Sequence, residues 1–399
     1  MPLSESDNMK PARPKRNVFL LGLVSLFNDL SSQMIYPLIP EFLTSIGAGP
    51  AIIGIIEGIA ESTAALFRTV FGRLSDRLGK RKPFIFLGYG LSAVSRPLLY
   101  FAGAWTAVLG VRFSDRLGKA VRTPARDALI STSVDPSKKG RAFGFHRAMD
   151  RVGALGGPLL ALLVLSLFNN QVRLVFLFSV IPAILALFFA IFAKETSVQK
   201  SPATSKNKQG LRNPGFVIFL IANIVFTLGN SSNAFLILRA RELGLSVALL
   251  PVIWMVYNAF CSMSSPIFGS LSDKLGRKPI IVTSFIYYAV VYFLFGLANS
   301  LLAIWFLFGA YGIYYGLSEG IFRAYIADLV EPHNRATAYG LFNTGIGLAL
   351  LPASLIMGAI WTEFGSKWAF FTSAGFSLLG FLIFMLGLAF RKSAKQKVN

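Results

Sequence analysis

Twelve stretches of this chain are long and apolar enough to cross a membrane as helices, and little sequence lies between them. A transmembrane helix needs about 20 mostly apolar residues. The stretches are 18–46, 51–71, 83–105, 106–130, 142–168, 173–193, 214–240, 249–268, 279–297, 301–329, 336–361 and 368–390. The composition agrees, because 54% of the residues are hydrophobic and 14% are charged, against about 25% charged residues in soluble domains. The sequence therefore predicts an all-α membrane protein with 12 transmembrane helices.

The positions of the basic residues predict how these spans are oriented. The net charge of +21 comes largely from segments that fall on one side of a twelve-span bundle: 10–16, 73–82, 138–141, 194–212, 274–278 and 391–397. The alternate connections carry almost no basic residues. This is the positive-inside pattern with both termini in the cytoplasm, and we expect a plasma (inner) membrane protein. Topology thus explains the charge, and we expect no nucleic-acid partner.

The most polar internal stretch, KETSVQKSPATSKNKQGLRN, divides the chain nearly in half and is typical of a flexible linker. We expect a cytoplasmic tail at 1–17, six-helix bundles at 18–193 and 214–390, a linker at 194–213 and a second tail at 391–399. The first span is too long for a signal-peptide core and is expected to be retained. Cys261 is the single cysteine, so no intrachain disulfide can form, and no cluster suits a metal.

A short motif occurs in each half of the chain, after the second span of that half. GRLSDRLGKRKP at 72–83 recurs as GSLSDKLGRKP at 269–279. Parallel six-helix repeats are known in transporters, where the substrate site lies near the midplane between them. We expect the loops to form a cytoplasmic latch that breaks as the halves rock; a basic loop that only sets topology is the alternative. The latch residues would be Gly72, Asp76, Arg77, Gly79, Gly269, Asp273, Lys274 and Gly276.

The repeated pattern G-x-L-S-D-[RK]-L-G-[KR]-[RK] resembles motif A of the major facilitator superfamily. The resemblance covers the whole chain and implies two six-helix bundles, a central cavity and alternating access without ATP. The set Gly144, Gly153 and Gly157-Pro158 resembles motif C of the superfamily's antiporters, although Ala161-Leu162 replaces its final glycine pair. Simple close packing of a kinked helix is the alternative interpretation of these glycines.

The span at 109–130 is unusually polar. On a helix at about 100° per residue, its charges fall inside an arc of roughly 140°; they are Arg112, Asp115, Arg116, Lys119, Arg122, Arg126 and Asp127. In a membrane bundle this face must turn toward a watery cavity or toward paired charges. The span also departs from the antiporter pattern R-x-x-Q-G, because Asp115-Arg116 stands in place of Gln-Gly.

Charges within the spans concentrate in the N-terminal half, where bases outnumber acids. A charge at the bilayer centre costs at least about 2.5–3.5 kcal/mol, so most of these groups must be paired or hydrated. Carboxylates buried beside arginines can take up and release protons. The candidates for proton coupling are Asp29, Glu57, Glu61, Asp115 and Asp150. The alternative is a network that only locks the N-terminal bundle.

The surplus of bases favours an anionic or zwitterionic solute, because guanidinium groups bind carboxylate or phosphate in a bidentate fork. In the C-terminal half, neutral polar and aromatic residues would complete the wall of the site. The candidates for substrate binding are Arg112, Arg116, Arg147, Arg151, Asn230, Tyr257, Tyr311, Tyr315 and Glu319. Ordinary interhelical contacts are the alternative for the C-terminal residues.

The sequence contains neither a phosphate-binding G-x4-G-K-[ST] loop nor an H-E-x-x-H motif, so we expect no enzyme and no cofactor. We predict a monomeric, proton-coupled secondary transporter of a small organic solute, and specifically an exporter or antiporter. One alternative is a proton symporter that imports an anionic nutrient or a siderophore-like metal chelate. The other is a membrane receptor that transports nothing.

Overall fold

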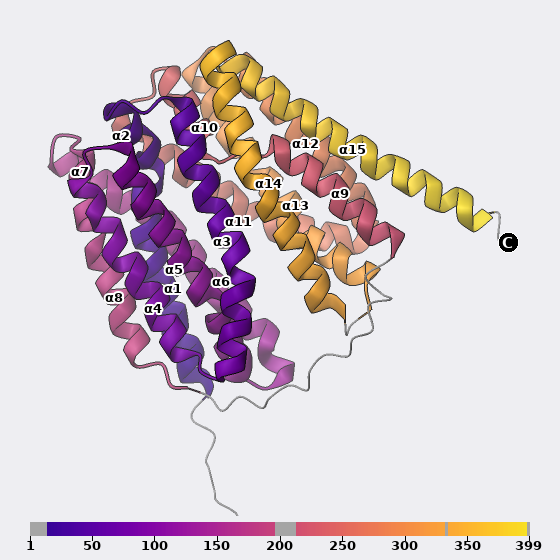
Figure 1. Ribbon diagram of the computed structural model, residues 1–399, viewed down its shortest axis with the longest axis horizontal. Coiled ribbons are helices and arrows are strands. Elements are labelled where there is room, and N and C mark those ends of the chain that lie inside the picture. The colour runs from indigo at the N-terminus through magenta and orange to yellow at the C-terminus, as the bar shows by residue number, and fades with distance from the viewer. Residues whose placement is uncertain (1–13, 196–212, 332–333, 397–399) are drawn as a thin grey trace, which may run out of the picture.

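The computed structural model describes residues 14–195, 213–331 and 334–396, and the regular secondary structure in these ranges is entirely helical (Figure 1). The N-terminal half contains α1 (Pro14–Ile35), η1 (Tyr36–Leu38), α2 (Ile39–Ser45), α3 (Pro50–Leu78), α4 (Lys82–Ser95), η2 (Arg96–Phe101), α5 (Trp105–Thr132), η3 (Pro136–Lys138), α6 (Lys139–Leu167), α7 (Val172–Phe178) and α8 (Val180–Ile191). The C-terminal half contains α9 (Pro214–Gly229), α10 (Ala234–Glu242), η5 (Val247–Leu249), α11 (Leu250–Leu275), α12 (Arg277–Leu297), α13 (Leu301–Leu329), α14 (Arg335–Phe364) and α15 (Ser366–Gln396).

The number of spans agrees with the prediction. Eleven helical spans in the described ranges are long and apolar enough to cross a membrane. The twelfth is α5, which is 28 residues long but carries the charged face. The prediction of an all-α membrane protein with 12 transmembrane helices is therefore confirmed. The helices extend beyond the expected bundle limits of 18 and 390, while the rest of the expected tails and most of the linker lie outside the described residues.

The first span of each half is interrupted at a corresponding place. In the N-terminal half, Pro37 and Pro40 stand where α1 passes through η1 into α2, because proline cannot donate the helical hydrogen bond. In the C-terminal half, residues 230–233 separate α9 from α10. Such paired interruptions of membrane helices leave backbone polar groups free and mark the binding region of many transporters.

Glycines allow the helices of the N-terminal bundle to approach closely. A Cβ atom at Gly153 of α6 would lie 2.6 Å from the carbonyl oxygen of Leu26 in α1, and one at Gly157 would lie 2.8 Å from that of Leu30. Small residues at such contacts let helix backbones meet, which is the main source of packing energy between helices in lipid. Gly153 and Gly157 of the pattern that resembles motif C thus allow α6 to pack against α1.

The two bundles lie side by side, with α3, α6, α11 and α14 between them (Figure 1). We call the end where α3 joins α4 and where α8 ends the linker end, and the opposite end the distal end. Hydrogen bonds and ion pairs join the halves at the distal end: Glu41–Arg241 at 2.6 Å, Trp254–Gln33 at 2.7 Å and Ala51–Thr362 at 3.2 Å. The distal end is therefore one place where polar contacts tie the two halves together.

Candidate functional site

A cavity of about 320 Å³ lies within the N-terminal bundle, where α13 completes its wall. Its lining comes from α1, η1, α3, α5, α6 and the α4–η2 junction, with Glu319 and Arg323 from α13. The lining is dominated by charge, which is unusual inside a membrane bundle. The carboxylates are Asp29, Asp115, Asp127, Asp150 and Glu319, and the cations are Arg68, Arg96, Arg112, Arg116, Lys119, Arg122, Arg126, Arg147 and Arg323.

The charged face of α5 supplies the largest share of this lining. All seven charged residues predicted on that helix border the cavity. The opposite face is apolar and includes Ala120, Val121 and Ala125, which are buried. The charged face of α5 therefore turns toward a polar interior, as expected.

Helices α3 and α5 are joined by two successive ion pairs, which we call the α3–α5 ladder. Arg112 donates from Nε and Nη2 to the two carboxylate oxygens of Glu57, at 2.8 and 2.7 Å. One turn further along both helices, Arg116 Nη2 lies 2.7 Å from Glu61 Oε1. The first pair is almost completely buried, with 4% and 1% of its side chains exposed. Glu57 also accepts a hydrogen bond from Ser232 of the C-terminal half, so this rung contacts both bundles.

Arg96 anchors the middle of the cavity wall. Its Nε donates to Asp115 at 2.9 Å, while its two terminal nitrogens donate to the backbone and side-chain oxygens of Asn28, each at 3.1 Å. Arg122 instead donates to the Gly88 carbonyl and the Ser92 hydroxyl, at 3.2 and 2.6 Å. Arg96 therefore cross-links three helices through charge-assisted hydrogen bonds, which are stronger than neutral ones.

Two carboxylates lie where α1 meets α6. Asp29 borders the cavity and accepts a hydrogen bond from Asn28 Nδ2 at 3.1 Å. Asp150 accepts one from Ser25 and lies 3.4 Å from His146 Nδ1. A Cβ atom on Gly153 would lie 2.8 Å from Cβ of Asp29. The close approach of α6 thus confines the Asp29 side chain toward the cavity.

Glu319 of α13 is the carboxylate by which the C-terminal half enters the lining. It lies 3.6 Å from Arg147, 3.9 Å from Arg151 and 3.8 Å from Arg323. Arg151 also donates to Cys261 Sγ at 3.2 Å. Because these contacts connect α6 with α11 and α13, they join the two halves at the side of the cavity.

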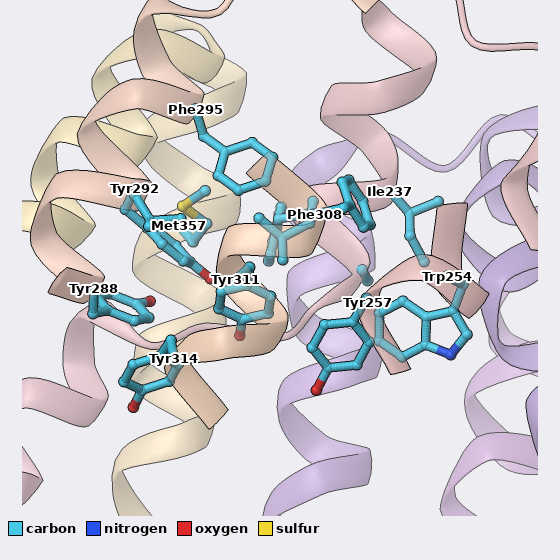
Figure 2. Close-up of a cluster of buried hydrophobic side chains, with 14 of the residues drawn as sticks. Ile237, Trp254, Tyr257, Tyr288, Tyr292, Phe295, Phe308, Tyr311, Tyr314 and Met357 are labelled. Atoms are coloured by element: carbon cyan, nitrogen blue, oxygen red, sulfur yellow. The ribbon is translucent and has the colours of Figure 1, made fainter. Parts of the chain in front are cut away.

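Apart from Glu319, the C-terminal residues predicted to bind the solute lie elsewhere. Tyr257, Tyr311 and Tyr315 belong to a packed aromatic cluster in the C-terminal bundle, where Tyr257 stacks on Tyr311 at 5.5 Å (Figure 2). Tyr311 donates to Asn233 at 2.6 Å, and Asn230 accepts from Tyr288 at 3.4 Å. Tyr257 and Tyr311 are part of the hydrophobic core and Tyr315 packs against it. The cavity lining, among the residues described, includes neither the three tyrosines nor Asn230.

The repeated loops share a local ion pair. Asp76 lies 2.6 Å from Arg81, which also donates to the Ser75 hydroxyl at 2.9 Å. In the second loop, Asp273 lies 2.5 Å from Arg277, which donates to Ser272 at 2.6 Å. In each loop the predicted glycine, Gly79 or Gly276, has a positive φ, of 64° or 88°, which favours glycine. Each aspartate thus pairs within its own half, while the contact between halves expected of a latch stays a prediction.

Sequence reasoning places the α5 face and the α3 carboxylates but leaves several lining residues unassigned. Arg68, Arg96, Lys119, Arg122, Arg126 and Arg323 all border the cavity, although none is among the predicted binding residues. Lys119, Arg122 and Arg126 could have been assigned to the cavity from the helical period of α5, which places them on its charged face. Arg96 has no such period, because it is a single charge in an apolar span.

Two six-helix halves with matching loops and interruptions, built around a charged cavity, define a membrane transport protein. The family model of the Major Facilitator Superfamily matches residues 21–232 and 218–399. The chain belongs to this superfamily, whose members are transporters rather than enzymes.

Individual relatives agree with this assignment. An uncharacterised transporter of the same type from Methanocaldococcus jannaschii is 37% identical over 90% of this chain and 91% of its own length. The multidrug resistance efflux pump PmrA of Streptococcus pneumoniae is 26% identical over 77% of this chain and 78% of its own. The crystal structure of a point mutant of the nucleoside transporter NupG has a TM-score of 0.80 at 14% identity, covering 93% of this chain and 99% of NupG. At that identity the likeness to NupG concerns the fold alone.

Proposed function

We propose that this chain is a proton-coupled secondary active transporter that moves a small organic anion across the plasma (inner) membrane by alternating access. The observation that carries the proposal is the charge of the cavity, where nine cations face five carboxylates. An enclosed surplus of positive charge lowers the free energy of a bound anion far more than it would in water. The basic linker end is cytoplasmic in this proposal, in agreement with the positive-inside pattern.

Asp29 is the proton carrier in this proposal. It borders the cavity beside the cations of α5, and its carboxylate is held by Asn28 rather than by an ion pair in the described structure. Protonation of Asp29 would remove a negative charge from the neighbourhood of a bound anion. Proton and anion would then bind cooperatively, because each strengthens the binding of the other. This sign of coupling favours symport, and an inward proton gradient would drive uptake.

Export of a small organic solute by proton antiport is the second candidate. It is supported by the similarity to the efflux pump PmrA and by Gly153 and Gly157 of the motif C pattern, which pack α6 against α1 near Asp29. In an antiporter the proton and the solute compete for the occupied site. The two candidates therefore differ in the sign of the coupling between protonation and solute binding.

The experiment is transport by the purified full-length chain in proteoliposomes that contain a pH-sensitive dye. A panel of small organic anions is added outside, with ethidium as a cationic comparison, and proton movement is recorded. Symport predicts that an anion carries protons inward with it, whereas antiport predicts proton movement opposite to the solute. No solute-dependent proton movement with any probe would contradict proton coupling to these solutes.

Asp29→Asn is expected to abolish proton-driven transport while the protein still inserts and solute exchange continues, because the carrier carboxylate is gone. Asp127→Asn is the matched control, since Asp127 borders the same cavity but is paired with Arg126 at 2.9 Å and is 46% exposed. Proton-driven rates equal to wild type in Asp29→Asn would exclude Asp29 as the carrier.

A further inference from the structure

The α3–α5 ladder ends in a rung that lacks its acid. One turn beyond Arg116 on α5 stands Lys119, and the positions of α3 that follow Glu61 by one turn are Ala64 and Ala65. The next charged residue of α3 is Arg68. Two rungs of paired charge are thus followed by Lys119, one turn further along α5, and by Arg68, two turns further along α3. We call the region of these two cations the end of the ladder.

The two cations at the end of the ladder have no hydrogen-bond or ion-pair partner among the residues that the structure describes. Lys119 and Arg68 both border the cavity, and neither side chain forms a hydrogen bond or an ion pair in the described ranges. Nε of Arg68 is buried without an acceptor, and so is Nε of Arg116, whose other nitrogen binds Glu61. A buried N–H group without an acceptor is costly, so a ligand that brings an acceptor to these two groups would be stabilised there.

The surrounding carboxylates do not balance these charges. The charges that act most strongly on Lys119 are those of Arg116, Glu61, Arg68 and Asp29. The carboxylate that acts most strongly on Arg68 is Asp127, which is itself paired with Arg126. Of the two acids that act on Lys119, Glu61 is already bound by Arg116. The other is Asp29, and its charge would be removed when it takes up the proton of the proposed transport cycle. When Glu57 and Glu61 are counted with the five lining carboxylates, seven acids still face nine cations.

The geometry points to an anion subsite at the end of the ladder, where Lys119, Arg68 and Nε of Arg116 bind a doubly charged group of the solute. A phosphoryl group or a pair of carboxylates would supply the missing acceptors and neutralise the two cations in excess. Guanidinium and ammonium groups are the usual partners of such anions. A neutral solute would leave both cations uncompensated, which is unfavourable in a poorly hydrated interior. The inference deepens the proposed function, on which it rests, by naming the class of solute.

The test is a carboxylate supplied by the protein at the end of the ladder. Thr123 borders the cavity one turn beyond Lys119 on α5, so Thr123→Glu places an acid within reach of the lysine. Thr123→Gln is the matched control, because it has the same size and differs only in charge. Lys119→Gln and Arg68→Gln test the two cations directly.

Binding is measured as the thermal stability of the purified full-length protein in detergent, at constant ionic strength set with chloride. Inorganic phosphate and phenyl phosphate probe the phosphoryl form, succinate probes the dicarboxylate form, and acetate is the singly charged comparison. We expect at least one dianion to raise the Tm of wild type and Thr123→Gln above the acetate value, since a ligand that binds the native state stabilises it. We expect about tenfold weaker binding in Thr123→Glu, Lys119→Gln and Arg68→Gln.

The subsite would be overturned if dianions raised the Tm of wild type no more than acetate does. It would also be overturned if dianions raised the Tm of Thr123→Glu as much as that of Thr123→Gln. If Thr123→Glu is too unstable to purify, the two glutamine variants decide by the same criterion. Failure of the transport proposal gives a different result. Dianions would bind and Thr123→Glu would weaken their binding, but proteoliposomes would move neither solute nor proton. Conversely, if Thr123→Glu leaves proton-coupled transport of the solute unchanged, the subsite is overturned while the proposal of a proton-coupled transporter still holds.

Discussion

The ion pair of Glu57 and Arg112 shows how much a single side chain matters inside this bundle. Removing two charges from water costs several kcal/mol, and their attraction repays this cost only with good geometry and further hydrogen bonds. Here the fork is bidentate, Ser232 donates to the same carboxylate, and the Arg112 guanidinium lies 5.6 Å from the centre of the Tyr36 ring. Loss of one partner would leave the other charge buried with few acceptors or donors.

Arg112→Met is therefore expected to destabilise the protein by about 3–5 kcal/mol, because it leaves the Glu57 carboxylate buried and unpaired. The double variant Glu57→Gln with Arg112→Met removes both charges and is expected to regain most of that loss. The measurement is thermal unfolding of the purified variants in the same detergent. A double variant no more stable than Arg112→Met would mean that the pair matters for packing rather than for charge compensation.

At the scale of elements, the contact between α1 and α6 positions Asp29, the proton carrier of the proposed transport cycle. The α6 glycines that face α1 allow backbone contact, whereas Gly144 of the same motif has nothing within 4 Å of its missing side chain. Matching the sequence pattern of the motif therefore does not by itself mean that a glycine is needed for packing. Whether a glycine in this helix is needed depends on which face it occupies.

Gly153→Ala is expected to destabilise the protein by about 1–3 kcal/mol, because its methyl group would meet the Leu26 carbonyl and Cβ of Asp29. Gly144→Ala is the control, and we expect it to be neutral or to stabilise α6 by up to about 1 kcal/mol through helix propensity. Thermal unfolding and proton-driven transport are measured together. If Gly153→Ala retains wild-type stability and transport, the close packing of α1 on α6 is not required.

The helices and the charged face of α5 could be predicted because they follow from local patterns, namely apolar length and a period of about 3.6 residues. The pairing of Arg112 with Glu57 could not, since it depends on how α3 and α5 are aligned in the bundle. The position of Tyr257 and Tyr311 in the aromatic core was also beyond the sequence. A tyrosine has an apolar body and a polar tip, so the same residue suits a solute wall and a packed core.

At the scale of the whole molecule, the two halves are similar in architecture and different in chemistry. Loops, interruptions and span order repeat, yet most of the paired charges belong to the N-terminal bundle and the large aromatic cluster to the C-terminal one. Alternating access needs two arrangements of such halves that differ by only a few kcal/mol. The contacts that join the halves at the distal end are therefore expected to affect the equilibrium between the two arrangements. Among those named above, the ion pair is formed by Glu41 and Arg241.

We expect Glu41→Gln to shift the protein toward an arrangement open at the distal end. The pair is partly exposed, with 19% and 31% of its side chains accessible, so its loss is worth about 1 kcal/mol, which changes the ratio of the two arrangements roughly fivefold. The readout is a cavity thiol from Ser32→Cys in a Cys261→Ser background, labelled by a membrane-impermeant maleimide added from the distal side. Labelling should be faster in Glu41→Gln.

The reversed pair, Glu41→Arg with Arg241→Glu, should return labelling toward the starting rate, because the attraction is restored with opposite polarity. Unchanged labelling in Glu41→Gln would show that this pair does not hold the distal end closed. Faster labelling that the reversed pair fails to correct would instead assign the effect to packing around α2 and α10. Only recovery by the reversed pair ties closure of the distal end to the attraction between the two charges.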